Sequence, residues 1–495
     1  MRDAGGVARV SRRDAIRGAM GMAACAMLAG AHAPTRREPR GTSPLPCPVS
    51  RPGDPGHARF CTSWNGCFRA APALVAHVRD AGDVAAALRF ARDEGLAVAV
   101  RSGGHSFAGA SVCDGVVIDV ASMSGVAPTD RPGVVAAGGG VRVGALETAL
   151  YRRFGGSTVT LGSCGSVGVS GLLLGGGFSA MSRVHGLTID ALDEVEAVLA
   201  DGTVVVANDR SNADLFWALR GGGAGFAVVT RMLFRVRPWR QAHAVTQHWA
   251  WTAGARVLER WSGWIESLPE GASASLVWMT SGDARSSDVR TIVRTERGEA
   301  AARRVAASLA EAMGTAPRRT REWSTDAPAA RGAEPANGPR TANASAFAEA
   351  SIGAGAAGTM AEAFRARRGG ADAGSSGTNA GAEGTAMLLC NAFGGAVAKV
   401  APDATAFAHR RARFLAEFAA EWPSDRPDLD AANRAWVRST SDAVRSSFGP
   451  GSYVNYADPG LRDWRAAYWG ANLARLEGIK RAVDPRGALA AKVAV

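Results

Sequence analysis

The chain has little lysine, few tyrosines and no long apolar run, and these shortages exclude several functions. Only three of the 57 basic residues are lysines, at Lys399, Lys480 and Lys492. The arginines are scattered along the chain and form no dense stripe with interleaved aromatics, so the net charge of +12 does not predict nucleic-acid binding. No segment is apolar over enough residues to cross a bilayer.

The cysteines do not form a metal-binding pattern. No CxxC pair and no Cys/His ligand spacing occurs, so no metal site is predicted. In an oxidising compartment Cys61 and Cys67 could form a disulfide. The other cysteines are Cys25, Cys47, Cys113, Cys164 and Cys390.

Length and glycine content point to a protein that encloses a large ligand. The 495 residues are enough for two sizeable cores. The 61 glycines exceed the usual share of about 7%. Without a collagen-like period, such an excess indicates tight turns and close backbone approaches.

The first 33 residues are typical of an export signal. Ser11-Arg12-Arg13-Asp14-Ala15-Ile16 resembles a bacterial twin-arginine signal, and it precedes a short apolar stretch over 19–31. We therefore expect a protein that folds before export to the periplasm or medium and stays off the membrane once the signal is removed. The alternative is a basic amino terminus without a signal. Residues 34–56, rich in proline and arginine, are expected to form an irregular arm.

Short apolar strands alternate with helices from residue 57 to 240, which predicts an α+β domain. Asp83 is expected to cap a helix that ends at Gly95. Asp201-Gly202 predicts the turn of a β-hairpin between strands at 195–199 and 203–206. The other predicted elements are strands at 96–100, 116–120, 133–137 and 226–234, and helices at 143–153 and 215–219.

The character of the sequence changes after Pro238, and we expect a second domain over 241–448. Five tryptophans fall between 249 and 278, and an Ala/Gly/Ser-rich stretch follows over 326–384, expected to be loop and poorly ordered helix. This stretch contains a GxGxxG pattern at 353–358. No strand precedes the pattern and no acidic residue follows at the required distance, so we reject it as a nucleotide site. Residues 449–495 are aromatic and turn-rich.

Two glycine-rich segments are the strongest candidates for cofactor binding. Both Arg101-Ser-Gly-Gly-His105-Ser-Phe-Ala-Gly109 and Gly162-Ser-Cys164-Gly-Ser-Val-Gly168-Val-Ser-Gly171-Leu-Leu-Leu-Gly175-Gly-Gly-Phe lie at strand ends or in loops. Bare backbone amides at such places can approach a flat, polyanionic cofactor. The alternative for each segment is a tight turn without a ligand.

Together with four further motifs, these segments resemble the berberine bridge enzyme-like FAD-linked oxidases of the vanillyl-alcohol oxidase superfamily. The further motifs are Asp214-Leu-Phe-Trp-Ala-Leu-Arg220-Gly-Gly-Gly, Gly225-Phe-Ala-Val-Val229-Thr, Tyr453-Val-Asn-Tyr456-Ala-Asp-Pro and Tyr468-Trp-Gly-Ala-Asn472. The resemblance implies two α+β domains with a PCMH-type FAD-binding fold. Residues 57–240 and 449–495 would hold FAD, and 241–448 would place a sheet and its helices over the isoalloxazine.

The resemblance also implies that FAD is bound covalently through His105 and Cys164. His105 would bond the 8α-methyl group and Cys164 would bond C6 of the flavin. The alternatives are a hydrogen-bonded loop histidine and a disulfide cysteine. The remaining cofactor contacts expected from the motifs are Arg101, Ser102, Gly103, Gly104, Ser106, Gly162, Val167, Gly168, Gly171, Gly175, Val229, Tyr456 and Asn472.

By the same resemblance Tyr456 is the catalytic base, with Tyr453 beside it. A free phenol has a pKa near 10, so a nearby arginine or hydrogen bonds to the phenolate would have to lower it. An extended backbone would point the two rings to opposite faces, so a turn is needed to bring both to one pocket. The alternative is a half-buried Tyr456 that only hydrogen-bonds the flavin or the substrate.

The expected function is an FAD-dependent oxidase acting on a small molecule and O2. It would remove a hydride from a sugar, glycoside or other secondary metabolite and pass the electrons to O2, giving H2O2. Two alternatives stay open. One is a dehydrogenase of the same fold with another acceptor. The other is a secreted carbohydrate-binding protein, in which the tryptophan-rich domain stacks sugars and the flavin half is vestigial.

Overall fold

The computed structural model describes residues 45–281, 287–325, 338–372 and 384–489. All described residues belong to one compact unit. The predicted export signal lies outside the described residues. Among the described helices none is long and apolar enough to cross a membrane.

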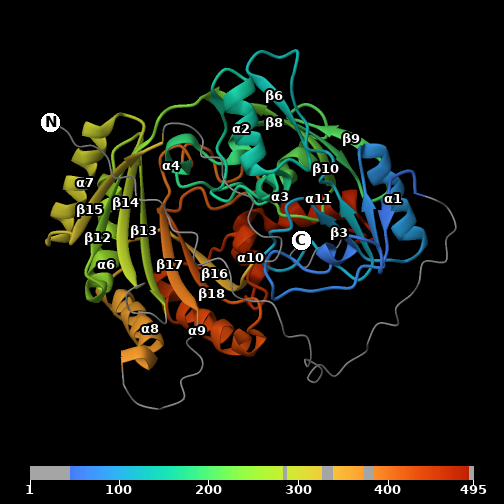
Figure 1. Ribbon diagram of the computed structural model, residues 1–495. Helices are drawn as coiled ribbons and strands as arrows, with labels where there is room; N and C mark the ends of the chain where they lie inside the picture. The colour runs from blue at the N-terminus through green and yellow to red at the C-terminus, as the bar shows by residue number, and fades with distance from the viewer. Residues whose placement is uncertain (1–44, 282–286, 326–337, 373–383, 490–495) are drawn as a thin grey trace, which may run out of the picture. The chain divides into compact units, whose positions relative to one another are not determined.

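A four-stranded sheet opens the half of the molecule that is expected to bind FAD, here called the flavin half (Figure 1). Its strand order is β1-β2-β4-β3, and both β2 and β3 run parallel to β4. The bounds are β1 Val49–Ser50, β2 Leu74–His77, β3 Val98–Arg101 and β4 Val116–Asp119, with helix α1 at Ala81–Asp93.

The predicted helix cap at Asp83 is wrong, because the cap is Asp80. Asp80 has an extended backbone, and its side chain accepts a hydrogen bond from the Asp83 amide. Asp83 lies inside the first turn, where Arg79 donates to its carboxylate over 2.9 Å and lowers its pKa.

The second sheet of this half has five antiparallel strands in the order β5-β6-β10-β8-β9. The hairpin predicted at Asp201-Gly202 joins β8 to β9, with the Thr203 amide donating to Asp201 Oδ1 over 2.8 Å. The bounds are β5 Val126–Pro128, β6 Val134–Gly138, β8 Leu192–Val198, β9 Val204–Ala207 and β10 Val228–Arg235. A two-stranded pair, β7 Ser157–Thr158 with β11 Arg237–Pro238, lies apart from this sheet.

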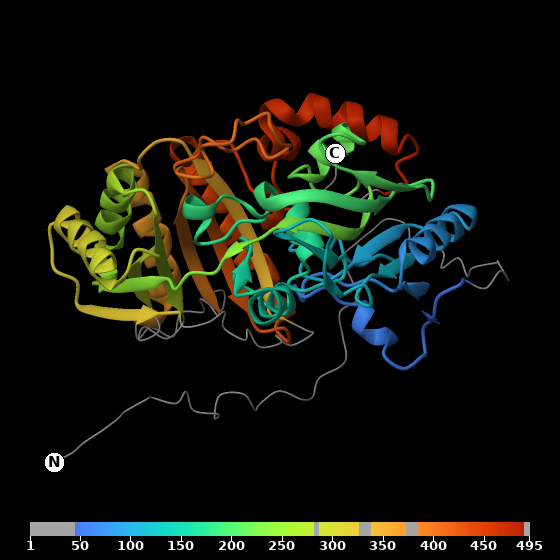
Figure 2. The same ribbon diagram turned by 90° about the horizontal axis from the view of Figure 1, so that it is seen from above.

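The carboxyl-terminal segment returns to the flavin half. Helix α11, Leu473–Val483, packs against α5, Ala213–Leu219, and Figures 1 and 2 both show it there. Lys480 Nζ donates to the Gly225 carbonyl over 2.6 Å. The other helices of this half are α2 Val143–Arg153, α3 Val169–Leu174, α4 Ser182–His185 and α10 Trp464–Trp469.

The second half is a seven-stranded antiparallel sheet with helices on one side (Figure 2). The strand order is β15-β12-β14-β13-β17-β18-β16. The strands are β12 His243–Trp249, β13 Ala272–Ser281, β14 Asp288–Thr295, β15 Arg319–Ser324, β16 Arg340–Ala348, β17 Thr385–Ala392 and β18 Phe414–Trp422. The helices are α6 Gly254–Trp264, α7 Glu299–Met313, α8 Ala354–Asp372 and α9 Asp430–Phe448.

Two expectations for this half are wrong. The stretch expected to be loop and poorly ordered helix contains strand β16 and a well-packed helix, α8, whose Phe364 stacks on Trp278 with ring centroids 4.7 Å apart. Tertiary packing overrides the low-complexity composition, because small side chains let α8 approach the sheet closely. Four of the five clustered tryptophans are buried in the core, namely Trp249, Trp261, Trp264 and Trp278. They are not available to stack sugars, which removes the main support for the carbohydrate-binding alternative.

The sheet is apolar on the helix side and partly polar on the other. Strand alternation puts Leu276, Leu388 and Phe418 in the core under the helices. The opposite face carries Ser275, Arg294, Asn343, Asn391 and Glu417. Residues of the flavin half contact this polar face, since Ser273 Oγ donates to the Ala180 carbonyl over 2.5 Å.

Candidate functional site

The two glycine-rich motifs meet backbone to backbone. A Cβ placed on Gly103 would collide with the backbone of Ser166 and Gly168, and one placed on Gly168 would lie 2.6 Å from the Gly103 amide nitrogen. Ser102 Oγ donates to the carbonyl of Gly139 over 3.3 Å, which brings in a third glycine-rich segment. Glycine is therefore required at this crossing by close approach of the chains.

His105 and Cys164 lie on either side of one hydroxyl group. Ser166 Oγ is 2.9 Å from His105 Nε2 and 3.3 Å from Cys164 Sγ. Trp64 stacks on the imidazole with ring centroids 5.0 Å apart. Both predicted attachment residues are half-buried, and Cys164 is not part of a disulfide. Sequence reasoning did not select Ser166 or Trp64, although Ser166 lies within the second motif.

The predicted Cys61–Cys67 disulfide is absent, because both side chains are free thiols. Cys67 Sγ instead donates to the Thr341 carbonyl of β16 over 3.7 Å. Burial raises the pKa of Cys67.

The Arg101 side chain stabilises the loop that carries His105 by contacts with residues 60–62. Its Nη1 donates to the Thr62 carbonyl over 2.9 Å, and the guanidinium lies 5.5 Å from the centre of the Phe60 ring. Burial lowers the pKa of Arg101. Gly104 has a φ of 76° and passes directly over this guanidinium, so the loop turns on Arg101 just before His105.

The other predicted cofactor residues divide into two groups. Ser106, Gly162, Val167, Gly171 and Gly175 lie in the two motif loops or in α3. Ser106 Oγ accepts from the Ala110 amide over 3.0 Å, and Gly175 is held against Asn455. Gly171 is exposed, with open space where a Cβ would be. An exposed glycine at this point leaves the backbone of α3 accessible to a flat ligand.

Asn472 and Val229 lie elsewhere. The Asn472 side chain donates to the carbonyls of Pro402, Thr405 and Ala406, at 2.8 to 3.4 Å. Val229 is buried in β10, where its carbonyl would collide with a Cβ on Gly139. The structure therefore gives Asn472 the role of holding a loop, and it does not bring this side chain to His105 and Cys164.

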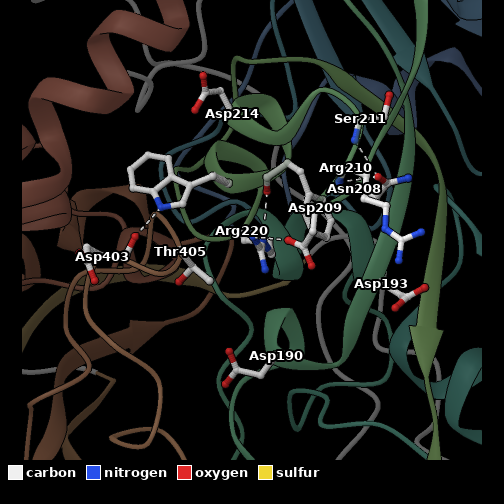
Figure 3. Close-up of polar contacts among 12 residues, drawn as sticks. Asp190, Asp193, Asn208, Asp209, Arg210, Ser211, Asp214, Arg220, Asp403 and Thr405 are labelled. Carbon is white, nitrogen blue, oxygen red and sulfur yellow. Dashed lines mark hydrogen bonds and ion pairs between the residues drawn. The ribbon is translucent and has the colours of Figure 1, made fainter.

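The Asp214–Gly223 motif holds the same loop from the other side. Trp217 Nε1 donates to the Asp403 carbonyl over 2.7 Å, and Arg220 pairs with Asp209 at 3.3 Å (Figure 3). Arg475 pairs with Asp214 at 2.8 Å. These contacts fix α5, α11 and the 402–406 loop together, so the motif stabilises the fold.

A turn brings the two predicted tyrosines together, as the sequence required. Val454–Tyr456 is a single 3-10 turn, and the two phenol rings meet edge to face with centroids 5.2 Å apart. Tyr453 is buried, and its hydroxyl accepts from the Phe178 amide at 3.2 Å and from Asn455 at 3.1 Å. Tyr456 is half-buried and faces Phe107 of the histidine loop at 6.1 Å. Tyr453 is therefore an anchor, and Tyr456 is the ring that packs against the histidine loop.

The partner of Tyr456 is a carboxyl group that sequence reasoning missed. The Tyr456 phenol lies within electrostatic range of the Glu417 carboxyl group of β18. Asn343 Nδ2 donates to Glu417 Oε1 over 2.5 Å. Burial raises the pKa of Glu417 to about 7, although the hydrogen bond from Asn343 acts in the opposite direction. The available signal was a buried acid at the centre of the otherwise apolar strand Phe414–Ala420.

The expected lowering of the Tyr456 pKa is therefore wrong. Burial and the charge of Glu417 raise the pKa of Tyr456 well above its ordinary value. A stable phenolate is disfavoured next to a carboxylate. The arrangement instead allows a proton to pass from the phenol to Glu417 when another proton reaches the phenol oxygen.

Two family models match the chain. An FAD binding domain matches residues 72–208, and the model described as berberine and berberine like matches residues 452–493. The first covers the histidine and cysteine loops, and the second begins one residue before Tyr453.

Curated relatives align over most of the chain. An uncharacterized FAD-linked oxidoreductase, YgaK of Bacillus subtilis, is 26% identical over 87% of this chain and 93% of its own. The aclacinomycin-N/aclacinomycin-A oxidase of Streptomyces galilaeus is 29% identical over 86% of this chain and 85% of its own. A glucooligosaccharide oxidase of Sarocladium strictum is 36% identical, over 39% of this chain and 40% of its own.

Solved structures share the architecture. A chitooligosaccharide oxidase superposes with a TM-score of 0.79 at 23% identity, covering 91% of this chain and 97% of its own. A glucooligosaccharide oxidase from Acremonium strictum, described as having a novel flavinylation, gives 0.77 at 24% identity, covering 90% and 97%. These likenesses confirm the predicted α+β, PCMH-type FAD-binding fold.

Proposed function

We propose that this FAD-linked oxidoreductase oxidises a sugar or glycoside at a hydroxyl-bearing carbon. Its matched segments and its relatives support a place in the berberine bridge enzyme-like family. The observation that carries the proposal is the pairing of Tyr456 with the buried carboxyl group of Glu417, next to the loop of His105. We further propose that 57–240 with 449–495 bind FAD, that 241–448 bind the substrate, and that the protein is exported.

The residues present fit FAD. Gly103 and Gly168 leave room for two loops to cross, and the exposed Gly171 leaves backbone accessible at α3. His105 and Cys164 are both half-buried nucleophiles that share Ser166, so both can form covalent bonds to one cofactor. When bound, FAD supplies the acceptance of a hydride and its transfer to O2 as H2O2.

Tyr456 and Glu417 perform the proton chemistry. Tyr456 removes the proton from the substrate hydroxyl while its own proton moves to the Glu417 carboxylate, so no free phenolate forms. Asn343 holds the carboxylate in place. Glu417 accepts a proton only when it is ionised, so activity rises as the pH increases through about 7.

The substrate class is proposed from the relatives. The names of the glucooligosaccharide oxidase and the aclacinomycin oxidase indicate sugars and glycosides. A dehydrogenase with another electron acceptor would use the same residues, so the acceptor is tested directly. Flavin reduced anaerobically by a sugar should be reoxidised by air with formation of H2O2. Reoxidation only by an added quinone or dye would favour the dehydrogenase.

The covalent attachment has its own test. Acid precipitation of the wild-type protein should leave a yellow pellet. His105→Ala and Cys164→Ala should each keep acid-stable flavin, and only the double variant should release it. Ser163→Ala is the matched control, since it removes an exposed side chain from the same loop. Complete release of flavin from either single variant would contradict the two-bond proposal.

A further inference from the structure

Arg294 of β14 is a half-buried cation on the polar face of the seven-stranded sheet. Its Nη1 donates to Ser275 Oγ over 2.9 Å, and Ser275 Oγ donates to Asn391 Oδ1 over 2.8 Å. Among the described residues no carboxylate lies within ion-pair distance of this guanidinium. Burial lowers the pKa of Arg294 to about 10, and the charge of Arg290 acts in the same direction.

The acidic groups at the start of this strand and just beyond its end already have partners, namely Asp288 and Glu296. Glu296 Oε1 is 2.7 Å from His185 Nε2 and 3.9 Å from Arg237. Asp288 is paired with His248 at 3.0 Å and with Arg290 at 3.2 Å. Neither carboxylate neutralises Arg294. A half-buried guanidinium without an acid leaves its charge partly uncompensated, and the carboxylate of a ligand would supply the missing anion.

Arg294 shares its face of the sheet with the proposed proton acceptor. Ser275 is opposite Asn391, and Asn391 is opposite Leu415, two residues before Glu417 on β18. Glu417 is therefore two strands away from Ser275 across the sheet and two residues further along its strand. At the usual strand spacing and rise, their backbones are roughly 12 Å apart. That separation corresponds to the length of a disaccharide.

We infer that Arg294, supported by Ser275 and Asn391, binds a carboxylate of the substrate, and that the preferred substrate is an acidic sugar or glycoside. Its carboxylate lies about one disaccharide length from the carbon oxidised beside Tyr456. A guanidinium can form two parallel hydrogen bonds to a carboxylate, and Ser275 already fixes one of its nitrogens. The inference rests on the proposed function in one respect, which is that the oxidised carbon lies beside Tyr456.

The test compares cellobiose with cellobiouronic acid, which carries a carboxylate on its non-reducing ring. Their methyl glycosides lack a free anomeric hydroxyl and report binding, as a perturbation of the flavin absorbance. The free sugars report anaerobic flavin reduction. The variants are Arg294→Gln, Arg294→Lys and the control Arg303→Gln, which removes one positive charge from an exposed helix surface.

In the wild type the acidic glycoside should bind more tightly than the neutral one. Arg294→Gln should weaken the binding of the acidic glycoside roughly 10- to 100-fold and leave the binding of the neutral glycoside unchanged. Arg294→Lys should recover part of the preference, because it keeps the charge without the planar pair of donors. Arg303→Gln should bind like the wild type. Arg294→Gln should be as stable as the wild type or more so, since it removes a cation without an acidic partner.

Two results would overturn the inference. They are equal binding of the two glycosides by the wild type, and equal weakening of both in Arg294→Gln. Failure of the proposed function looks different. In that case the acidic glycoside binds through Arg294, while neither free sugar reduces the flavin. A third outcome is that cellobiose reduces the flavin equally well in the wild type and in Arg294→Gln, and that the acidic glycoside binds no more tightly than the neutral one. This outcome would keep the proposed function and reject the carboxylate site.

Discussion

Replacing Glu417 by glutamine separates the proton acceptor from its structural role. Glutamine has nearly the same shape and can still accept the hydrogen bond from Asn343, but it cannot take up a proton. Loss of a general base typically lowers the rate about 10²–10⁴-fold. We expect Glu417→Gln to slow anaerobic flavin reduction by that order in stopped-flow experiments. The increase in rate through pH about 7 should disappear, because the group that titrates there is gone.

The same variant should be more stable at alkaline pH. Burial raises the pKa of Glu417 from its ordinary 4.5 to about 7, so the folded state holds the proton more tightly than the unfolded state. The resulting stabilisation is complete below pH 4.5 and is lost as the pH rises towards 7. At pH 8 the ionised buried carboxylate costs on the order of 3 kcal/mol, at 1.36 kcal/mol per pH unit. Glutamine removes this cost, so the urea midpoint of the variant should exceed that of the wild type at pH 8 and the difference should shrink towards pH 5.

Glu421→Gln is the matched control, since Glu421 is on the same strand but exposed. It should change both readouts only slightly. Near-normal flavin reduction in Glu417→Gln with an unchanged pH profile would refute the role of Glu417. A slow variant that also loses stability at pH 8 would mean that the carboxyl group is structural.

Three further predictions test other parts of the molecule. Tyr456→Phe should lower the rate of flavin reduction about 10²–10⁴-fold in stopped-flow experiments, with the covalent flavin intact. Tyr453→Phe should mainly lower the melting temperature, because the Tyr453 hydroxyl accepts hydrogen bonds from Phe178 and Asn455. The opposite pattern would exchange the two roles. Replacing Arg12 and Arg13 by lysine should leave folded, flavin-loaded protein in the cytoplasm, as cell fractionation would show, and efficient export of that variant would argue against a twin-arginine signal. Gly103→Ala should reduce the amount of bound flavin and the thermal stability, because a Cβ there collides with the loop of Cys164, whereas the exposed Gly353→Ala control should do neither.

Local patterns in the sequence were sufficient for much of the flavin half. The residues that shape a strand or turn are adjacent in the chain, so the hairpin at Asp201-Gly202 and helix α2 follow from spacing and turn chemistry. The two glycine-rich motifs indicated FAD because their order and composition reflect close backbone approach. The helix cap was misplaced by three residues, since Asp80 and Asp83 are equally good capping types and only the extended backbone of Asp80 distinguishes them.

Composition misled in the second half, where packing decides. The Ala/Gly/Ser-rich stretch forms β16 and α8, and its few large side chains are buried, as where Phe364 stacks on Trp278. The tryptophans are in the core because that face of the sheet lies under four helices.

The sequence by itself determined the fold class, the loops that carry His105 and Cys164, and the Tyr453–Tyr456 segment. Each of these depends on motifs of residues that are adjacent in the chain. Only the tertiary structure decided which groups meet. Strand register on the polar face of the sheet puts Glu417 against Tyr456 and leaves Arg294 with Ser275, and these partners come from separate strands and a distant turn. Their chemistry follows from burial and from neighbouring charge, which depend on three-dimensional packing.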